Sequence, residues 1–315
     1  MRGVISKGQI MKILIAYDGS ESANNAINDL PRAGLPREAQ ALLLNVRERW
    51  LTMPSSSEIV TELSAASEGA AVKTARIKEE PGIGQLEEES PLLFEAYEKL
   101  RAYFPAWKID CVTVKGSPAF EIIRNAKKWN ANLIVVGSKG MTENRDFSLG
   151  SVSQKIANES HCSVRIVRGH AWKKGAPTRI LIALDGTLPS QMAVEEVARR
   201  MWMMGSEVRI VTAKDSNESN QKSIEEKTDI ESWINSFIDT AEQTLKHSTL
   251  GVTKVVEEGD PKNIIVRAAG EWGADCIFIG STGTGTSHEI LLLGTVASAI
   301  VARAHCTVEI VRHQG

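Results

Sequence analysis

The sequence has few cysteines and no long apolar segment. Cys111, Cys162, Cys276 and Cys306 are the only cysteines among 315 residues, and none belongs to a Cys-x-x-Cys pair. Because so few thiols cannot build a disulfide framework, we expect reduced side chains that pack as small hydrophobes. No apolar run approaches the roughly 18 residues that span a bilayer, and residues 1–12 lack the apolar core of a signal peptide. These absences predict a cytoplasmic protein with no membrane partner.

An excess of charge of either sign is also missing. Lys and Arg total 37 and Asp and Glu total 39, so the net charge is −2. A protein that coats nucleic acid needs a clear cationic excess, so we predict no nucleic-acid partner. Apolar residues make up 42% and charged residues 24% of the chain. That balance is typical of a globular protein, and the length suggests about two domains, each able to bury a core.

Familiar catalytic and metal-binding motifs are absent. The sequence contains no GxxxxGK[ST], HExxH or GxSxG, and the stretch 283–288 begins like GxGxxG but has His288 at the third glycine position. His161-Cys162 and His305-Cys306 are adjacent pairs that enter predicted strands, so their side chains point to opposite faces. No second pair completes a four-ligand set. We therefore predict no metal centre and no enzyme.

The chain repeats itself. Residues 12–20 match residues 179–187 at six of nine positions, at an offset of 167, and residues 161–168 match residues 305–312 at six of eight positions, at an offset of 144. Between them, Trp129 matches Trp272 at an offset of 143, so the first copy carries 167 − 143 = 24 extra residues. We predict a first domain at 1–169, with an insertion around 52–92, a linker at 170–177 and a second domain at 178–315.

Each copy alternates short apolar runs with helical patterns. Runs that are apolar on both faces suit strands of a buried parallel sheet. Two sets of five strands alternating with helices predict two doubly wound α/β domains, with ligands beyond the carboxyl ends of the strands. The predicted strands are 13–17, 41–46, 111–114, 133–136, 164–167, 180–184, 208–213, 252–256, 276–279 and 308–311, and the predicted helices are 21–30, 91–103, 118–129, 152–159, 189–203, 229–246, 261–271 and 295–303.

Two loops in each copy could carry a ligand. Asp18 and Asp185 follow the first strand of each copy, where a carboxylate either caps the next helix or accepts hydrogen bonds from a ribose or base. Residues 137–151 form a glycine-rich loop that leads into a helix. Glycines and a helix N-terminus expose N–H groups to an anion, so this loop is either a phosphate cradle or an ordinary glycine turn.

These features resemble a known family. Each half resembles the universal stress protein domain, and the whole chain resembles a tandem universal stress protein. The resemblance rests on Asp18-Gly-Ser, the Gly116-Ser-Pro118 turn, residues 131–138 and the closing His-Cys-x-Val strands. It also rests on the family's nucleotide pattern, a Gly-x2-Gly-x9-Gly-Ser loop, which the first copy fits from Gly137 to Ser151 without a gap.

The resemblance implies a five-stranded parallel sheet in each half, helices on both faces and packing of the halves as an intrachain pseudo-dimer. A homodimer of the tandem chain would also fit. In one subgroup of the family it implies tight binding of ATP, or of ADP or AMP, with Mg²⁺ accompanying the phosphates. Carried onto this sequence, the first site comprises Ala16, Tyr17, Asp18, Val46, Val136, Gly137, Lys139, Gly140, Gly150, Ser151, Val152 and Ser153.

The second copy departs from the pattern, because its spacer, residues 284–293, has ten residues instead of nine and its loop lacks Lys and Arg. Its candidate residues are Leu184, Asp185, Ala213, Gly280, Gly283, Gly294, Thr295 and Ala297. The leading hypothesis is an ATP-binding regulator or sensor of the stress response with at most slow ATP hydrolysis. The alternatives are an interaction protein that binds no nucleotide and works through its insertion, and an adenine-nucleotide hydrolase or ligase, whose Ser-Gly-Gly-x-Asp-Ser loop residues 17–22 do not match.

Overall fold

A computed structural model describes residues 10–48, 90–139, 149–169, 175–214, 224–246, 248–282 and 293–312. The first half contains β1 (Met11–Ala16), α1 (Glu21–Asp29), a 3-10 turn (Leu30–Arg32), β2 (Ala39–Arg47), α4 (Pro91–Tyr103), β3 (Lys108–Lys115), α5 (Pro118–Trp129), β4 (Leu133–Gly137), α6 (Ser151–Glu159) and β5 (Ser163–Val167). The second half contains β6 (Arg179–Ala183), α7 (Leu188–Arg199), β7 (Glu207–Lys214), α9 (Ile224–Leu245), β8 (Gly251–Glu258), α10 (Pro261–Trp272), β9 (Cys276–Gly280), α11 (Thr295–Arg303) and β10 (Thr307–Val311).

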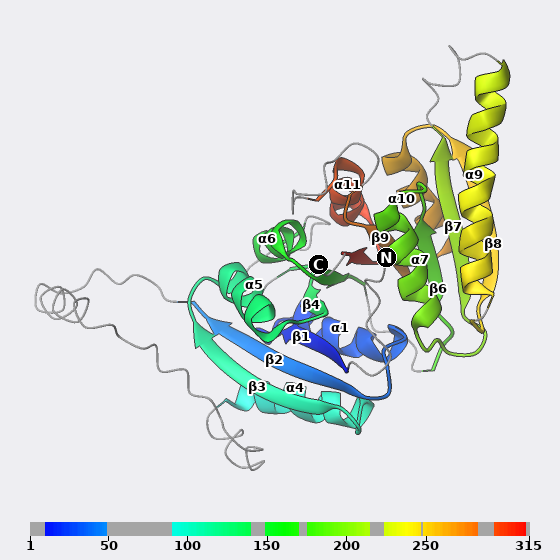
Figure 1. The fold of residues 1–315 in the computed structure, drawn as a ribbon. Helices are drawn as coiled ribbons and strands as arrows, with labels where there is room; N and C mark the ends of the chain where they lie inside the picture. Colours follow the sequence, from blue (N-terminus) through cyan, green and yellow to red (C-terminus); the bar gives the residue numbers. More distant parts are fainter. Residues whose placement is uncertain are drawn as a thin grey trace, which may run out of the picture.

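The ten strands form one sheet, in the order β3-β2-β1-β4-β5-β10-β9-β6-β7-β8. Within each half all neighbouring strands are parallel. The halves meet where β5 and β10 pair antiparallel, and we call this junction the seam. The predicted α/β class and the two repeated doubly wound halves are therefore confirmed, and the two five-stranded sheets are continuous across the seam (Figure 1).

Helices cover both faces of this sheet. On one face, α5, α6, α10 and α11 pack over a single apolar cluster that includes residues from both halves. On the other face, α1 and α4 cover a cluster of the first half, while α7 and α9 cover a cluster of the second half. One face therefore has a shared core and the opposite face has two separate cores.

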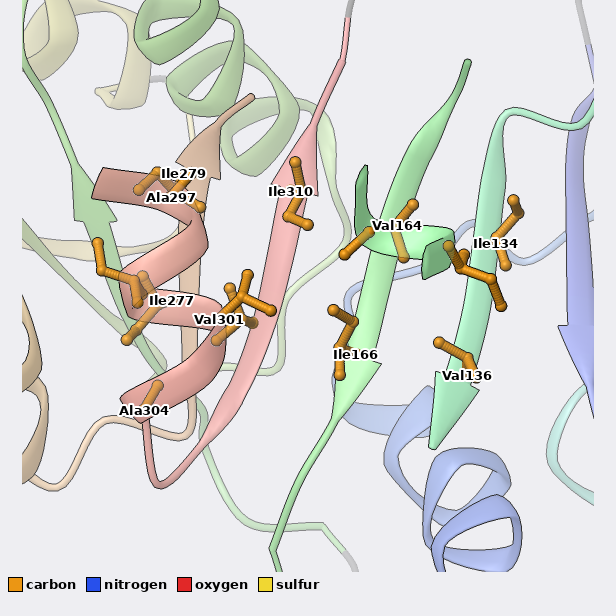
Figure 2. Close-up of a cluster of buried hydrophobic side chains, with 14 of the residues drawn as sticks. Ile134, Val136, Val164, Ile166, Ile277, Ile279, Ala297, Val301, Ala304 and Ile310 are labelled. Carbon is orange, nitrogen blue, oxygen red and sulfur yellow. The ribbon is translucent and has the colours of Figure 1, made fainter. Parts of the chain in front are cut away.

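The shared core crosses the seam without interruption. Val164 and Ile166 of β5 lie beside Ile310 of β10, and Ile134 and Val136 continue the apolar surface along β4 (Figure 2). Val164, Ile166 and Ile310 are each at most 1% exposed. Burying such side chains is the main favourable contribution to folding, so the halves are held together by core packing as well as by backbone hydrogen bonds.

Two arginines link the helices of one half to the last strand of the other. Arg168, after β5, donates to the carbonyls of Ala302 and Ala304 at the end of α11. Arg312, after β10, donates through Nη2 to the carbonyls of Ala157 (2.6 Å) and Asn158 (3.4 Å) near the end of α6. A cation at a helix C-terminus satisfies otherwise unpaired carbonyls and favours the negative end of the helix dipole.

Most predicted elements agree with the structure to within a few residues, and α7 is the main correction. The sequence predicts a helix over 189–203, but α7 ends at Arg199. Arg200 leaves the helix with extended backbone angles, and its guanidinium turns toward buried carboxylates at the seam. Trp202 folds back and donates its Nε1–H to the carbonyl of Val197 at 2.8 Å. Tertiary contacts thus end a helix that the apolar pattern would continue.

Candidate functional site

The candidate site of the first half lies at the carboxyl ends of three adjacent strands. β1 lies between β2 and β4 in the sheet. Ala16, the last residue of β1, pairs with Leu44 of β2, and Ile15 pairs with Val135 of β4. Residues that follow Ala16 and Val135 therefore emerge at the same edge, which is where doubly wound sheets bind ligands.

Tyr17 is part of the scaffold of this edge. Its N–H donates to the carbonyl of Leu44, and its carbonyl accepts from Nδ2 of Asn45, each at 2.9 Å. Its ring is 3% exposed and lies in the apolar cluster beneath α1 and α4, and its hydroxyl donates to Oδ1 of Asn24 at 3.0 Å. Burial raises the pKa of the Tyr17 phenol, which keeps it a neutral donor. Tyr17 thus holds the turn in place with its side chain directed into the core.

Asp18 shapes the turn and exposes part of its carboxylate. Its Oδ1 accepts the N–H of Ser20 at 2.9 Å, and Ser20 caps α1 by accepting the N–H of Ala23 at 3.1 Å. The cap is therefore Ser20, and Asp18 supports it from two residues before. Asp18 is half-buried, and within the described part of the chain its Oδ2 makes no hydrogen bond. This oxygen is available to accept from a ligand.

The glycine-rich loop is closed at its base. Gly150 donates its N–H to the carbonyl of Ser138 at 2.8 Å, and the hydroxyl of Ser153 reaches that same carbonyl at 2.8 Å. The N–H of Lys139 donates to Oγ of Ser22 in α1 at 3.2 Å. These contacts bring the two ends of the loop together beside the first turns of α1 and α6. The Ser153 hydroxyl is therefore a buried brace of the loop.

Gly137 allows the closest approach at this edge. A Cβ atom at Gly137 would lie 2.6 Å from the backbone carbonyl carbon of Ser22, which is shorter than any real contact. Only glycine therefore lets the end of β4 pass against the start of α1.

Apolar side chains line the same edge from one face. Ala16, Val46, Val136 and Val152 all belong to or pack against the shared core, although they come from three strands and a helix. Val46 and Val152 are half-buried and form the outer border of this surface. Gly150 precedes α6, and Ser151 is its exposed first residue, so the helix N-terminus lies at the same edge. Gly140 and residues 141–148 lie outside the described residues.

The second half builds an equivalent edge with different side chains. Gly294 donates to the carbonyl of Ser281 at 2.8 Å, as Gly150 does to Ser138. Asp185 accepts through Oδ1 from the N–H of Thr187 at 3.0 Å and from its hydroxyl at 2.5 Å. Ala297 stands where the first half has Ser153, so this loop has no equivalent hydroxyl brace. Thr295 begins α11, Ala213 borders the shared core, and Gly283 lies outside the described residues.

Aromatic side chains cover the aspartate turn of the second half. A Cβ atom at Gly186 would lie 2.6 Å from the Phe237 ring and 2.9 Å from the Trp233 ring, both from α9. Gly280 lies equally close to Pro189 of α7, where a Cβ atom would be 2.6 Å from the backbone carbonyl carbon. In the first half, Leu92 of α4 takes the covering position over Gly19.

Sequence reasoning missed Asn45 and Ser22, which hold the site together. Asn45 interrupts the apolar run of β2, and a lone buried amide in such a strand is a signal that it bonds a nearby backbone group. Ser22 lies on α1 and gives no comparable signal. Among the described residues, no group of His, Cys, Asp and Glu could hold a metal ion, and no described helix is long and apolar enough to cross a membrane.

The family model described as the universal stress protein family matches the chain twice, over residues 9–168 and 177–312. The chain belongs to the universal stress protein family. The universal stress protein YxiE of Bacillus subtilis is 32% identical over 160 residues, which cover 50% of this chain and 98% of that protein. A universal stress protein of Methanocaldococcus jannaschii is 30% identical over 178 residues, which cover 53% of this chain and 89% of that protein. Each of these universal stress proteins is thus similar to about half of the chain.

Solved structures match the whole tandem. A universal stress protein from Archaeoglobus fulgidus superposes with a TM-score of 0.63 at 22% identity and covers 96% of this chain and 98% of its own. A putative universal stress protein from Pseudomonas aeruginosa superposes with a TM-score of 0.60 at 14% identity, covering 97% and 94%. At these identities the likeness concerns the fold, and the two-half architecture is therefore shared with other universal stress proteins.

Proposed function

We propose that the first half of this universal stress protein binds an adenine nucleotide at the carboxyl edge of β1, β2 and β4. ATP is the leading ligand, with ADP and AMP as alternatives. The observation that carries the proposal is the closed loop base, where Ser138, Gly150 and Ser153 tie the glycine-rich loop to the N-terminus of α6. A helix N-terminus beside a glycine-rich loop presents N–H groups and a positive dipole end to phosphate.

The rest of the edge suits an adenosine moiety. Val46, Val136 and Val152 offer an apolar surface of the kind that a flat base packs against. Oδ2 of Asp18 can accept from a ribose hydroxyl or from the base. The same carboxylate chemistry suits Mg²⁺ when it accompanies the phosphates, because this ion prefers oxygen ligands. Mg²⁺ held near Asp18 would neutralise part of the negative charge of the phosphates.

We further propose that the second half binds nucleotide more weakly than the first. Its loop lacks the hydroxyl brace because Ala297 replaces Ser153, its spacer is one residue longer, and it contains no Lys or Arg. The whole protein would then act in the cytoplasm as a regulator or sensor of stress whose signal is nucleotide occupancy. The domain division at 169 and 178 remains part of this proposal, as does a homodimer of the tandem chain.

The decisive experiment identifies small molecules released from the denatured full-length protein by mass spectrometry and then titrates the nucleotide-free protein with Mg-ATP by calorimetry. About one equivalent of adenine nucleotide is expected. Asp18→Ala should weaken binding roughly tenfold, as expected for loss of a charged hydrogen bond, with unchanged circular dichroism. Asp185→Ala is the matched control and should leave the main binding event unchanged. An empty protein that binds no added Mg-ATP would favour the interaction-protein alternative.

A further inference from the structure

A buried charge pair occupies the centre of the seam. Arg165 of β5 and Glu309 of β10 are directly opposite in the antiparallel register, and they are 1% and 0% exposed. Nη1 of Arg165 lies 2.9 Å from Oε2 of Glu309. Their neighbours in the register are apolar, because Val308 pairs with Ile166 and Ile310 pairs with Val164. The charges are therefore confined to one position of an otherwise apolar junction.

The pair continues into a chain of alternating charges. Nε of Arg165 lies 2.6 Å from Oδ2 of Asp29 in α1. On the other side, Nη1 of Arg200 lies 3.0 Å from Oε2 of Glu309, and its Nη2 lies 2.7 Å from Oε1 of Glu196 in α7. The order is acid, base, acid, base, acid. The link from Arg165 to Glu309 joins the two halves, whereas Arg165–Asp29 lies within the first half and Glu309–Arg200 and Arg200–Glu196 lie within the second.

Charged residues of the seam occupy equivalent positions of the two copies. Arg165 and Glu309 are equivalent positions of the two copies, at an offset of 309 − 165 = 144, in stretches that otherwise differ only by Ser163 against Thr307. Asp29 and Glu196 are equivalent at an offset of 196 − 29 = 167. Because equivalent positions face each other, the pseudo-twofold axis of the seam passes between residues 165 and 309. A seam between two identical halves would therefore place two identical residues opposite each other at this axis.

Stability alone does not explain a buried charge chain. Removing ions from water is costly, and well-packed apolar residues usually stabilise such a position at least as well. Burial alone would lower the pKa of Arg165, but Asp29 and Glu309 raise it, so its charge is kept. Burial alone would raise the pKa of Glu196, but Arg200 and Arg199 lower it. Arg165 and Glu196 thus remain charged, and the best-attested use of buried ions is to fix register and oligomeric state.

We propose that the Arg165–Glu309 pair makes the seam selective, so that the first half fits the second half of this chain and rejects a copy of itself. Pairing of two first halves would bring Arg165 against Arg165, and pairing of two second halves would bring Glu309 against Glu309. Like charges at hydrogen-bonding distance in a water-free junction repel strongly. The partner that this surface fits is therefore a homologous half of opposite charge. The proposal does not depend on nucleotide binding.

Single charge reversals in the full-length chain reproduce the two rejected pairings. Glu309→Arg puts a base against Arg165, as two first halves would, and Arg165→Glu puts an acid against Glu309, as two second halves would. Each variant should lower the midpoint of thermal unfolding by on the order of 10 °C, since each breaks a buried ion pair. The double variant R165E/E309R restores opposite charges across the seam. It should recover at least half of the summed loss, although its new carboxylate at position 165 lies beside Asp29 and its new guanidinium at position 309 lies beside Arg200.

The matched control is the pair Arg168→Glu and Arg312→Glu. These arginines are also buried and equivalent, but each donates to helix carbonyls of the opposite half, so their losses should add in the double variant. Additive losses for the 165 and 309 variants would overturn the proposal, as would midpoints unchanged to within 2 °C. If a single reversal prevents folding, the double variant still decides. A folded double supports the proposal, and an unfolded double overturns it.

Discussion

At the scale of single residues, the brace made by the Ser153 hydroxyl distinguishes the two candidate sites. In the first half this hydroxyl reaches the carbonyl of Ser138, and in the second half Ala297 offers nothing to the carbonyl of Ser281. A buried hydrogen bond of this kind contributes about 1 kcal/mol. The loop of the first half should therefore be the better ordered of the two loop bases.

Ser153→Ala tests this difference. The free energy of unfolding should fall by about 1 kcal/mol, and nucleotide affinity of the first half should fall several-fold because the loop base loosens. Ala297→Ser is the matched control. It should leave the free energy of unfolding unchanged or raise it slightly. Urea unfolding and calorimetric titration measure both quantities. Equal effects of the two substitutions would contradict the role given to Ser153.

His161 is a second residue with a measurable effect. Its ring lies where β5 begins, and among the described residues neither of its nitrogens has a hydrogen-bond partner. Burial lowers the pKa of His161, and Lys127 and Arg312 lower it further. The unfolded chain, with a His pKa of about 6.5, therefore binds a proton more readily than the folded protein does.

The sign of the pH effect follows from this shift. The contribution of His161 to the free energy of unfolding should be fully present above about pH 6.5. It should be lost as the pH drops through about 6.5 toward the lower pKa that His161 has in the folded protein. His161→Leu removes this contribution, so the variant should lose less stability than the parent between pH 7.5 and pH 5.5. Urea midpoints at the two pH values measure the difference. If the parent and the His161→Leu variant lose the same stability between the two pH values, His161 is not responsible for the pH dependence.

Residue types near the site were only partly readable from the sequence. Asp18 and the glycine spacing could be singled out as candidates because they follow a buried strand and precede a helix. The scaffold role of Tyr17 and the brace of Ser153 were not predicted, because the direction of a side chain depends on which face of β1 or α6 is covered. The Arg165–Glu309 contact was also missed, since it joins positions 144 apart in the chain.

At the scale of elements, each of the helices α6 and α11 is fixed at both ends by different halves. The N-terminus of α6 joins the loop base of the first half, and its last carbonyls accept from Arg312 of the second half. The end of α11 accepts from Arg168 of the first half in the same way. We therefore expect a change at one end of such a helix to affect the contacts at its other end.

Paired substitutions separate stability from binding at these helices. Arg312→Met and Arg168→Met should each lower the free energy of unfolding by about 2 kcal/mol, since each leaves helix carbonyls unpaired. Only Arg312→Met acts on α6, so only this variant should also weaken nucleotide binding by the first half. Urea unfolding and calorimetric titration distinguish the two effects. Equal affinity in both variants would show that the end of α6 does not influence the loop.

The elements themselves were largely predictable. The starts of α4, α5 and α10 follow from prolines at the first helical position, and the bounds of α11 follow from the spacing of apolar residues. The end of α7 was not predictable, because Arg200 leaves the helix to reach partners on distant elements. Pairing of β5 with β10 likewise has no periodic signal, since both strands read as ordinary buried strands from either half.

At the scale of the whole molecule, the shared core predicts one cooperative unit. Its buried residues come from both halves, whereas the opposite face keeps separate cores. Ile27→Ala acts on the core of the first half and Ile182→Ala on that of the second, and both side chains are fully buried. Each should cost roughly 2–5 kcal/mol and should shift a single calorimetric transition of the full chain. Two transitions, each moved by one variant, would show that the halves unfold independently.

The antiparallel pairing of β5 with β10 is also insensitive to the amount of protein present. Both strands belong to one chain, in which residues 168–178 connect the first half to the second, so association is intramolecular. Short connections of this kind give effective local concentrations on the order of millimolar. Dilution therefore does not separate the halves, and the assembled pair exists from the first molecule synthesised. The state of the seam is therefore the same at low and at high protein concentration.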